Sequence, residues 1–456
     1  MKFLIKQLLV GVSFLIYYCF YISDFLEENT FLLVTFFYLF LISVIYITPN
    51  IRWKRFPIEG FFLLYAIIVI GFGMMNAVEK VRSGWWSNYN IKLSIPAFYC
   101  SVFLTIFVFV LLSRKIMKKK SNSNTCRIKK IFIDIDLKSL KTISLLLFFS
   151  GVISTIFILS VRGTAPIFDP SLRFKFFEQY TFLNYTMLYA LVLAQIFSFI
   201  LYKNRLMHIL EFGTIFIISS GILLLTSARG IFLMPIFVMF LIGNYIYRKV
   251  KTYKLVLFIV FAILSVAFIY NVRERSGFSF LGRIKYFYRF FSEFFDFALL
   301  VQIVPREMPY TYTENLYAGL MFLLPKEVWN LFGIDKMWVL ENNPGAKISN
   351  FLGRTTGTRL SIFGDAYFFA GGLGVIFWAV VIGLLMNKFL KDVYESDLFR
   401  KRILGIMGCS VLIFIIPFEL GVGFIPRILL YYVYPLILFK VLEKRNVQKN
   451  QTTEMA

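Results

Sequence analysis

Arg229 is the residue whose isolation in this sequence most clearly suggests a chemical role. It is the only charged residue between Glu211 and Arg248, within the apolar stretch TSARGIFLMPIF at residues 226–237. A guanidinium group stays charged and can bind two phosphate oxygens at once. A turn followed by the start of a helix adds free N–H groups and a dipole that favours anions. We predict an anion-binding role for Arg229; the alternative is an interfacial arginine that reaches lipid headgroups.

Arg427 is isolated in the same way, in GFIPRILLYY, where no other charged residue occurs between Glu419 and Lys440. Several cations at separate turns on one membrane face would suit a single polyanionic ligand, and a lipid-linked diphosphate combines a charged head with an apolar tail. The candidate residues for this ligand are Arg173, Arg229, Arg354, Arg359 and Arg427, with Arg162 and Lys175 in the same loop as Arg173.

Two carboxylates are candidates for proton transfer. Asp365 lies in FGDAY, where a long polar segment re-enters the apolar part of the chain, and Glu419 lies within an apolar run. Ionisable groups at membrane depth are functional candidates, and a carboxylate could accept the proton of an attacking hydroxyl. A structural hydrogen bond between helices is the alternative for Glu419. We take Asp365 as the candidate general base.

The sequence has none of the common metal or nucleophile motifs: no HExxH, no GxSxG, no Walker loop and no metal-binding DxD. Its sole histidine, His208, lies at the end of an apolar run, so we expect no metal and no cofactor. Three of the four cysteines lie inside apolar runs, which predicts no disulfide framework.

The elements that position these residues must be membrane helices. Hydrophobic residues make up 59% of the 456 residues, and the mean hydropathy is +0.74. Apolar runs of about 18–22 residues recur, and in lipid such runs form helices because the backbone must bond to itself. The net charge of +24 does not indicate nucleic-acid binding, because the basic residues cluster in short loops between the runs. The expected fold is an all-α, polytopic bundle.

We predict about twelve membrane-spanning helices. They lie at residues 4–22, 30–48, 58–77, 91–113, 142–161, 180–202, 209–227, 230–247, 255–272, 366–386, 403–424 and 428–443. The first is expected to be retained rather than cleaved as a signal peptide. Most of the 49 lysines and arginines then fall in short loops on one side, which is predicted to be cytoplasmic together with both termini.

One long outer segment, residues 273–365, separates spans at 1–272 from those at 366–456. Its first part, LGRIKYFYRFFSEFFDFALLVQIV, places a polar face on one side of a helix, which predicts an amphipathic helix in the membrane interface. That face comprises Lys285, Arg289, Glu293 and Asp296. NLYAGLMFLLPKEVW is too short to cross and is re-entrant or interfacial, and NNPGAKISNFLGRTTGTRLSIFGD is expected to be a loop.

Three motifs, RGTAPIFDPSLR, TSARGIFLMPIF and TTGTRLSIFGDAYFFAGGLG, resemble those of bacterial oligosaccharide repeat-unit polymerases, the Wzy type of O-antigen polymerase. The layout is similar as well: about twelve spans, cytoplasmic termini and an enlarged periplasmic loop. The resemblance covers the whole chain in architecture and these short motifs in sequence. It implies a GT-C-like membrane glycosyltransferase in the bacterial inner membrane, with its active site facing the periplasm.

Such enzymes move a growing glycan from undecaprenyl diphosphate onto the end sugar of a newly flipped lipid-linked repeat unit. The resemblance therefore implies lipid-linked oligosaccharides as substrates, with a chain-length regulator and a flippase as partners, and no nucleotide sugar. The family's periplasmic arginines would correspond to Arg173 and Arg229. Where some members have a glycine after such arginines, this chain has Asn184 and Asp365.

Three other functions fit parts of the pattern. An O-antigen ligase shares the architecture, but the ligases resemble one another in a periplasmic histidine, and no predicted outer segment here contains a histidine. A lipid-linked oligosaccharide flippase would have short outer loops and charged residues along its spans, unlike this chain. A structural membrane scaffold is the remaining alternative.

Overall fold

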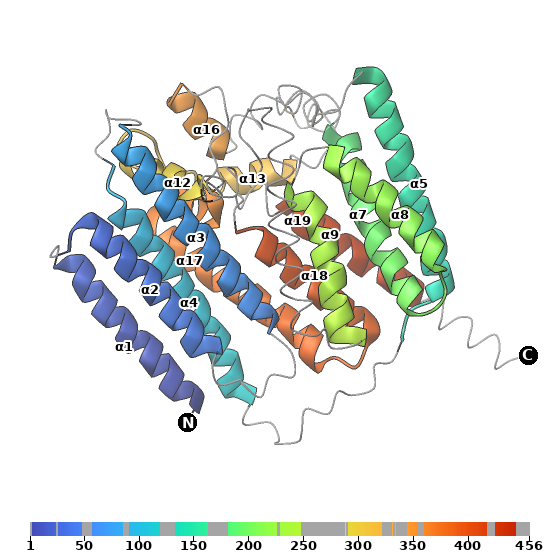
Figure 1. Cartoon of the computed structure of the whole chain (residues 1–456), viewed down its shortest axis with the longest axis horizontal. Helices are drawn as coiled ribbons and strands as arrows, with labels where there is room; N and C mark the ends of the chain where they lie inside the picture. Colours follow the sequence, from blue (N-terminus) through green and yellow to red (C-terminus); the bar gives the residue numbers. More distant parts are fainter. Residues whose placement is uncertain are drawn as a thin grey trace, which may run out of the picture.

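The computed structural model is helical throughout the residues that it describes, and it has no β-strand among them (Figure 1). The described residues are 2–23, 26–47, 57–84, 91–118, 133–162, 181–225, 229–247, 288, 291–321, 331, 333, 344–353, 360–416 and 425–443. The predicted span at 255–272 lies outside them.

The helices follow one another with these bounds: α1 Lys2–Ile22, α2 Glu28–Ile47, α3 Ile58–Arg82, α4 Ser94–Lys118, α5 Leu137–Arg162, α7 Thr181–Lys203, α8 Ile209–Leu225, α9 Arg229–Ile242, α12 Glu293–Ile303, α13 Glu314–Met321, α16 Pro344–Phe351, α17 Ser361–Glu395, α18 Phe399–Phe414 and α19 Ile425–Ile428. Helix α9 continues into η2 (Gly243–Tyr247), and α19 continues into η5 (Leu429–Val433). The predicted helical character is confirmed.

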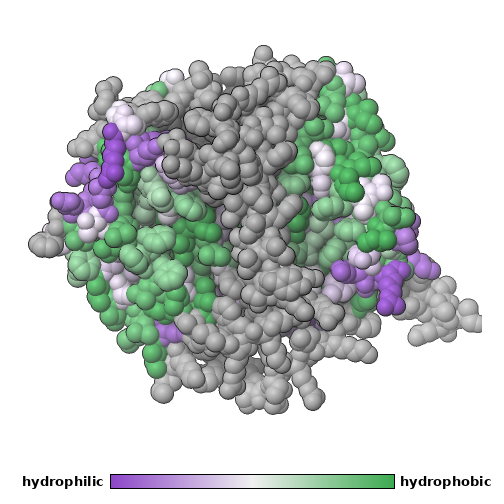
Figure 2. Space-filling view, in the orientation of Figure 1, coloured by the Kyte–Doolittle hydropathy of each residue, from purple (hydrophilic) through white to green (hydrophobic). Residues whose placement is uncertain are grey.

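Among the described residues, six helices, α1 to α5 and α17, are long and apolar enough to cross a membrane. Their outward side chains are apolar too: Leu8 of α1 and Leu146 of α5 are each 64% exposed. Figure 2 shows such apolar side chains over both flanks of the molecule. Side chains of this kind are stable at the surface only in contact with lipid or a partner. The chain is a helical membrane protein with several spans, while the count of twelve and the orientation stay predictions.

Helices α12, α13 and α16 gather at the upper end of the bundle in Figure 1, and we call this end the loop side. Below it, α1 to α4 pack with α12 and α17, while α5, α7 and α8 form a second group. Helices α9 and α18 lie between the two groups, since α18 contacts α17, α3 and α9, and α9 contacts α7 and α8.

The structure differs from the sequence prediction at α12. The predicted polar face includes Glu293 and Asp296, but these carboxylates are only 3% and 5% exposed. The cause is that α12 packs against α3, α4 and α17 together, leaving it no solvated face. Gly73 of α3 permits the approach, because a Cβ atom there would lie 2.7 Å from the Cβ atom of Phe294.

A second difference concerns the segment after residue 342, which was predicted to be a loop. Residues Pro344–Phe351 form the short helix α16. Proline suits the first position of a helix because its missing N–H has no partner there in any case. The polar composition of the segment obscured this short helix.

Candidate functional site

The loop-side end of α17 is built around a break in its helix. Ala370 (φ −161°, ψ 38°) and Gly371 (φ 63°, ψ −142°) leave the helical conformation inside Ser361–Glu395. The angles of Gly371 lie near a region that only glycine adopts readily. The glycine-rich end of the third motif therefore produces a kink in α17.

The kink frees two backbone carbonyl groups, and the loop after α12 satisfies them. The N–H of Thr311 donates to the carbonyl of Phe368 at 3.0 Å, and the N–H of Tyr312 donates to that of Phe369 at 3.0 Å. In an uninterrupted helix both carbonyls would accept from residues four positions later. The break in α17 thus fixes the chain after α12 against the loop-side end of this helix.

Three tyrosines meet at the kink, and we call Tyr99, Tyr310 and Tyr367 the kink cluster. The ring centroid of Tyr367 lies 4.9 Å from that of Tyr99 and 6.2 Å from that of Tyr310. A Cβ atom on Gly371 would stand 2.7 Å from the hydroxyl oxygen of Tyr310, so a larger residue there would displace this tyrosine. Arg306, which is exposed, interacts electrostatically with Tyr367.

Asp365 lies one turn inside α17 and is fully buried, at 0% exposure. Its neighbour Gly364 faces Phe297 of α12, where a Cβ atom would lie 3.3 Å from the phenylalanine side chain. The carboxylate has a hydrogen-bonding or electrostatic partner. From the sequence, we predict that Asp365 lies where the chain re-enters the membrane and faces a lipid head. In the structure its side chain is covered, so a substrate hydroxyl could reach it only if the neighbouring residues moved.

Arg427 lies on α19 beside two buried tyrosines, and we call Arg427, Tyr189 and Tyr431 the Arg427 cluster. Its charge interacts electrostatically with both tyrosine side chains. The two rings meet edge to face with centroids 4.7 Å apart. Tyr431 is 1% exposed, and its hydroxyl has no hydrogen-bond partner among the described residues. An unpaired buried hydroxyl costs about 1–3 kcal/mol, so a ligand oxygen bound beside Arg427 would relieve that cost.

Both α17 and α19 contact α18. The N–H of Ile362, at the start of α17, donates to the carbonyl of Ile416 at 3.0 Å, just beyond α18. Helix α19 packs against α18 and also against α13 from the loop side. The helices that carry Asp365 and Arg427 thus share α18 as a neighbour.

Arg229 is the first residue of α9, and α8 ends at Leu225. This confirms the predicted position at the start of a helix, immediately after a short connection, and α8 packs against α9. Arg173, Arg354, Arg359 and Glu419 lie outside the described residues, as does the side chain of Arg229.

The kink cluster was not predicted from the sequence. Its only local signal is the run FFAGG at 368–372, where paired glycines follow aromatic residues at the start of a span. The exposed Arg306 was also not singled out. In the described part of the chain, no three His, Cys, Asp or Glu side chains lie close enough together to hold a metal ion.

Comparisons with protein-family models, curated proteins and solved structures find no match for this chain. The resemblance to repeat-unit polymerases therefore stays a prediction from three motifs and the layout. Of these motifs, TSARGIFLMPIF runs into α9, and TTGTRLSIFGDAYFFAGGLG contributes the start and the kink of α17. Most of RGTAPIFDPSLR lies outside the described residues.

Proposed function

We propose that this protein is a membrane glycosyltransferase that polymerises lipid-diphosphate-linked oligosaccharides. The observation that carries the proposal is the Arg427 cluster: one arginine and an unsatisfied buried hydroxyl among apolar helices, near the side that holds α12, α13 and α16. A cation at this position suits an anionic head whose apolar tail stays in the bilayer. The membrane-helix fold and the resemblance of the motifs support the same function.

In the proposed reaction, a hydroxyl of the acceptor sugar attacks the anomeric carbon of the donor glycan. The bond from that carbon to the diphosphate oxygen breaks, and negative charge develops on the leaving oxygen. Arg427 would stabilise this charge, together with Arg229 and Arg173. Cations fixed in a partly dry site supply several kcal/mol of transition-state stabilisation, as removal of single hydrogen-bond donors in other enzymes shows. The substrate-binding role of Arg354 and Arg359 belongs to the same proposal.

The proton of the attacking hydroxyl must pass to a base. Asp365 is the proposed base, but its burial at 0% exposure requires that the kinked end of α17 shift when substrate binds. Tyr367 of the kink cluster lies on the same stretch of helix, and tyrosine combines an apolar ring with a hydroxyl that can donate to a sugar oxygen. Sugar binding at the kink cluster would couple acceptor placement to exposure of Asp365.

The test is incubation of the purified protein with a defined lipid-linked repeat unit, followed by separation of the products by length. The unmodified protein should give a ladder. Arg427→Ala should lower the rate by about a hundredfold or more, the scale seen when one stabilising group is removed from an active site. Lys138→Ala, at an exposed lysine of α5, is the control and should give a normal ladder. A normal ladder from Arg427→Ala would remove this cluster from the mechanism.

The same assay separates the alternative functions by their products. A ligase would transfer one glycan to an acceptor that is not a repeat unit, and a flippase would move the lipid between leaflets without forming a bond. We further propose that the loop side faces the periplasm of the inner membrane and that both termini are cytoplasmic. Labelling of a cysteine introduced at Tyr312, which is exposed, by a membrane-impermeant reagent added to intact cells tests this orientation.

A further inference from the structure

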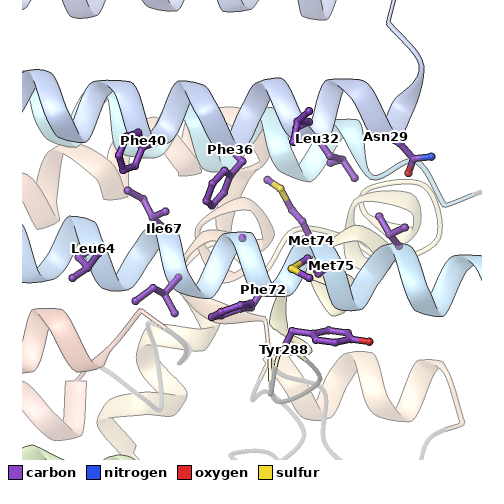
Figure 3. Close-up of a pocket in the computed structure, with 14 residues that line it drawn as sticks. Asn29, Leu32, Phe36, Phe40, Leu64, Ile67, Phe72, Met74, Met75 and Tyr288 are labelled. Atoms are coloured by element: carbon purple, nitrogen blue, oxygen red, sulfur yellow. The ribbon is translucent and has the colours of Figure 1, made fainter. Parts of the chain in front are cut away.

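An apolar groove runs along the outer surface of the N-terminal bundle, between α2 and α3 (Figure 3). Its volume is about 700 Å³. Phe36 and Phe40 of α2 and Leu64, Phe72 and Met75 of α3 contribute to its walls. The groove is open toward lipid, because Met75 is 54% exposed and Leu64 is 40% exposed.

A second, more polar cavity of about 500 Å³ lies at the loop-side end of α3. The two cavities share Met75, Val78 and Tyr288 in their walls, so they lie next to each other. Glu79, Arg82 and Ser83 line the polar end. An apolar channel that ends in a small charged chamber has the shape and polarity of a binding site for a single-chain amphiphile.

The length of the groove suits a long apolar chain. Its wall on α3 extends from Leu64 to Val78, which at 1.5 Å per residue is about 21 Å. One leaflet is about 15 Å deep, half of the roughly 30 Å hydrocarbon core. A chain that fills the groove therefore extends past the middle of the bilayer, as a long isoprenoid chain does.

The charges at the polar end suit a diphosphate that is held in place while its bond to the sugar stays intact. Arg82 is exposed, and no described carboxylate lies within ion-pairing distance of its guanidinium. Lys80 points elsewhere, since its ammonium lies 4.7 Å from the centroid of the Phe295 ring of α12. Glu79 offsets part of the local positive charge. One available arginine can hold a phosphate but provides little of the charge needed to stabilise a leaving group.

We propose that the groove binds the isoprenoid tail of the acceptor, with its intact diphosphate at Arg82. The role as acceptor rests on the proposed function, in which donor and acceptor are both lipid-linked and only the donor's diphosphate leaves. Helix α12 packs against both α3 and α17. A saccharide attached at Arg82 would therefore cross α12 to reach the kink cluster, where its terminal sugar would meet the donor.

The test uses photo-crosslinking in lipid nanodiscs with a polyprenyl diphosphate that carries a diazirine in its tail. Labelled peptides should map to α2 and α3, and unlabelled undecaprenyl diphosphate should compete. Met75→Trp, which fills the groove, should lower this labelling to background. Arg82→Ala should weaken it about tenfold, as expected for the loss of one charge-assisted contact. Leu146→Trp and Lys92→Ala, at exposed positions outside the groove, should label normally.

Several results would overturn the site. Equal competition by phosphatidylglycerol would show that the groove holds an ordinary membrane lipid, and unchanged labelling in Met75→Trp would place the tail elsewhere. Because crosslinking requires no turnover, the two proposals fail separately. Specific labelling of α2 and α3 without any polymer formation would refute the proposed function and leave an isoprenoid-binding site. Polymer formation without this labelling would refute the groove alone.

Discussion

Replacing Gly371 by alanine should destabilise the protein and displace the kink cluster. Its main-chain angles, φ 63° and ψ −142°, lie near a region that costs a residue with a side chain about 1–3 kcal/mol. The added Cβ atom would also stand 2.7 Å from the hydroxyl oxygen and 3.1 Å from the Cζ atom of Tyr310, so this tyrosine must move. We expect a loss of about 2 kcal/mol or more in the free energy of unfolding.

The assay is thermal unfolding of the detergent-solubilised protein, followed by intrinsic fluorescence. For a chain of 456 residues, 2 kcal/mol should lower the midpoint by about 2 °C. Gly213→Ala is the matched control: a Cβ atom on this residue of α8 would meet nothing within 4 Å. Alanine is the better helix former, so this control should leave the protein unchanged or raise its stability by about 0.5–1 kcal/mol.

A double substitution separates the two causes of the loss. Tyr310→Ala removes the close contact but leaves the strained backbone, so Gly371→Ala should cost less in that background and still destabilise. Purely additive effects would show that the contact contributes nothing. If Gly371→Ala unfolds at the same temperature as the unmodified protein, the left-handed conformation at this residue, and with it our account of the kink, is wrong.

Three further substitutions test the packing that supports the site. Arg400→Ala removes the guanidinium whose Nε atom lies 2.8 Å from a carboxylate oxygen of Asp134, a side chain that is only 8% exposed. Chemical unfolding should show a loss of about 1–3 kcal/mol in the free energy of unfolding. Glu59→Ala removes the carboxylate oxygen that accepts a hydrogen bond from the Tyr394 hydroxyl at 3.1 Å. Thermal unfolding should show a similar loss of stability, and a smaller one in Glu59→Gln. Gly408→Val adds a side chain where a Cβ atom would already lie 2.7 Å from a phenylalanine ring of α17. The yield of folded protein on gel filtration should therefore fall sharply. An unchanged yield would contradict the close approach of α17 and α18.

The membrane helices could be predicted from the sequence because each depends on a local property, a run of apolar residues long enough to cross the bilayer. The start of α9 at Arg229 could be predicted for the same reason, from the short segment of small and polar residues between two such runs. Helix α12 could not. Its charged residues repeat at helical spacing, but whether that face meets water depends on α3, α4 and α17, which come from elsewhere in the chain.

The site was predictable only in part. Isolation within apolar sequence identified Arg427, and Tyr431 follows it one helical turn later, but Tyr189 comes from α7, far away in the chain. Asp365 was identified by its position at the start of an apolar run, which says nothing about burial beneath neighbouring helices. The kink cluster joins residues from α4, the loop after α12 and α17, and no spacing in one segment could reveal it.

The position of α18 has a consequence for how this chain can change over evolution. Gly408 holds α18 against Phe389 of α17, and Ile416 holds the beginning of α17. The stretch from Gly408 to Ile416, which is helical as far as Phe414, sets a distance of about 12 Å. One residue inserted in its helical part would move its end by about 1.5 Å and rotate it by roughly 100°. Relatives of this protein should therefore vary freely in the length of their connecting loops and keep the number of residues in this stretch constant.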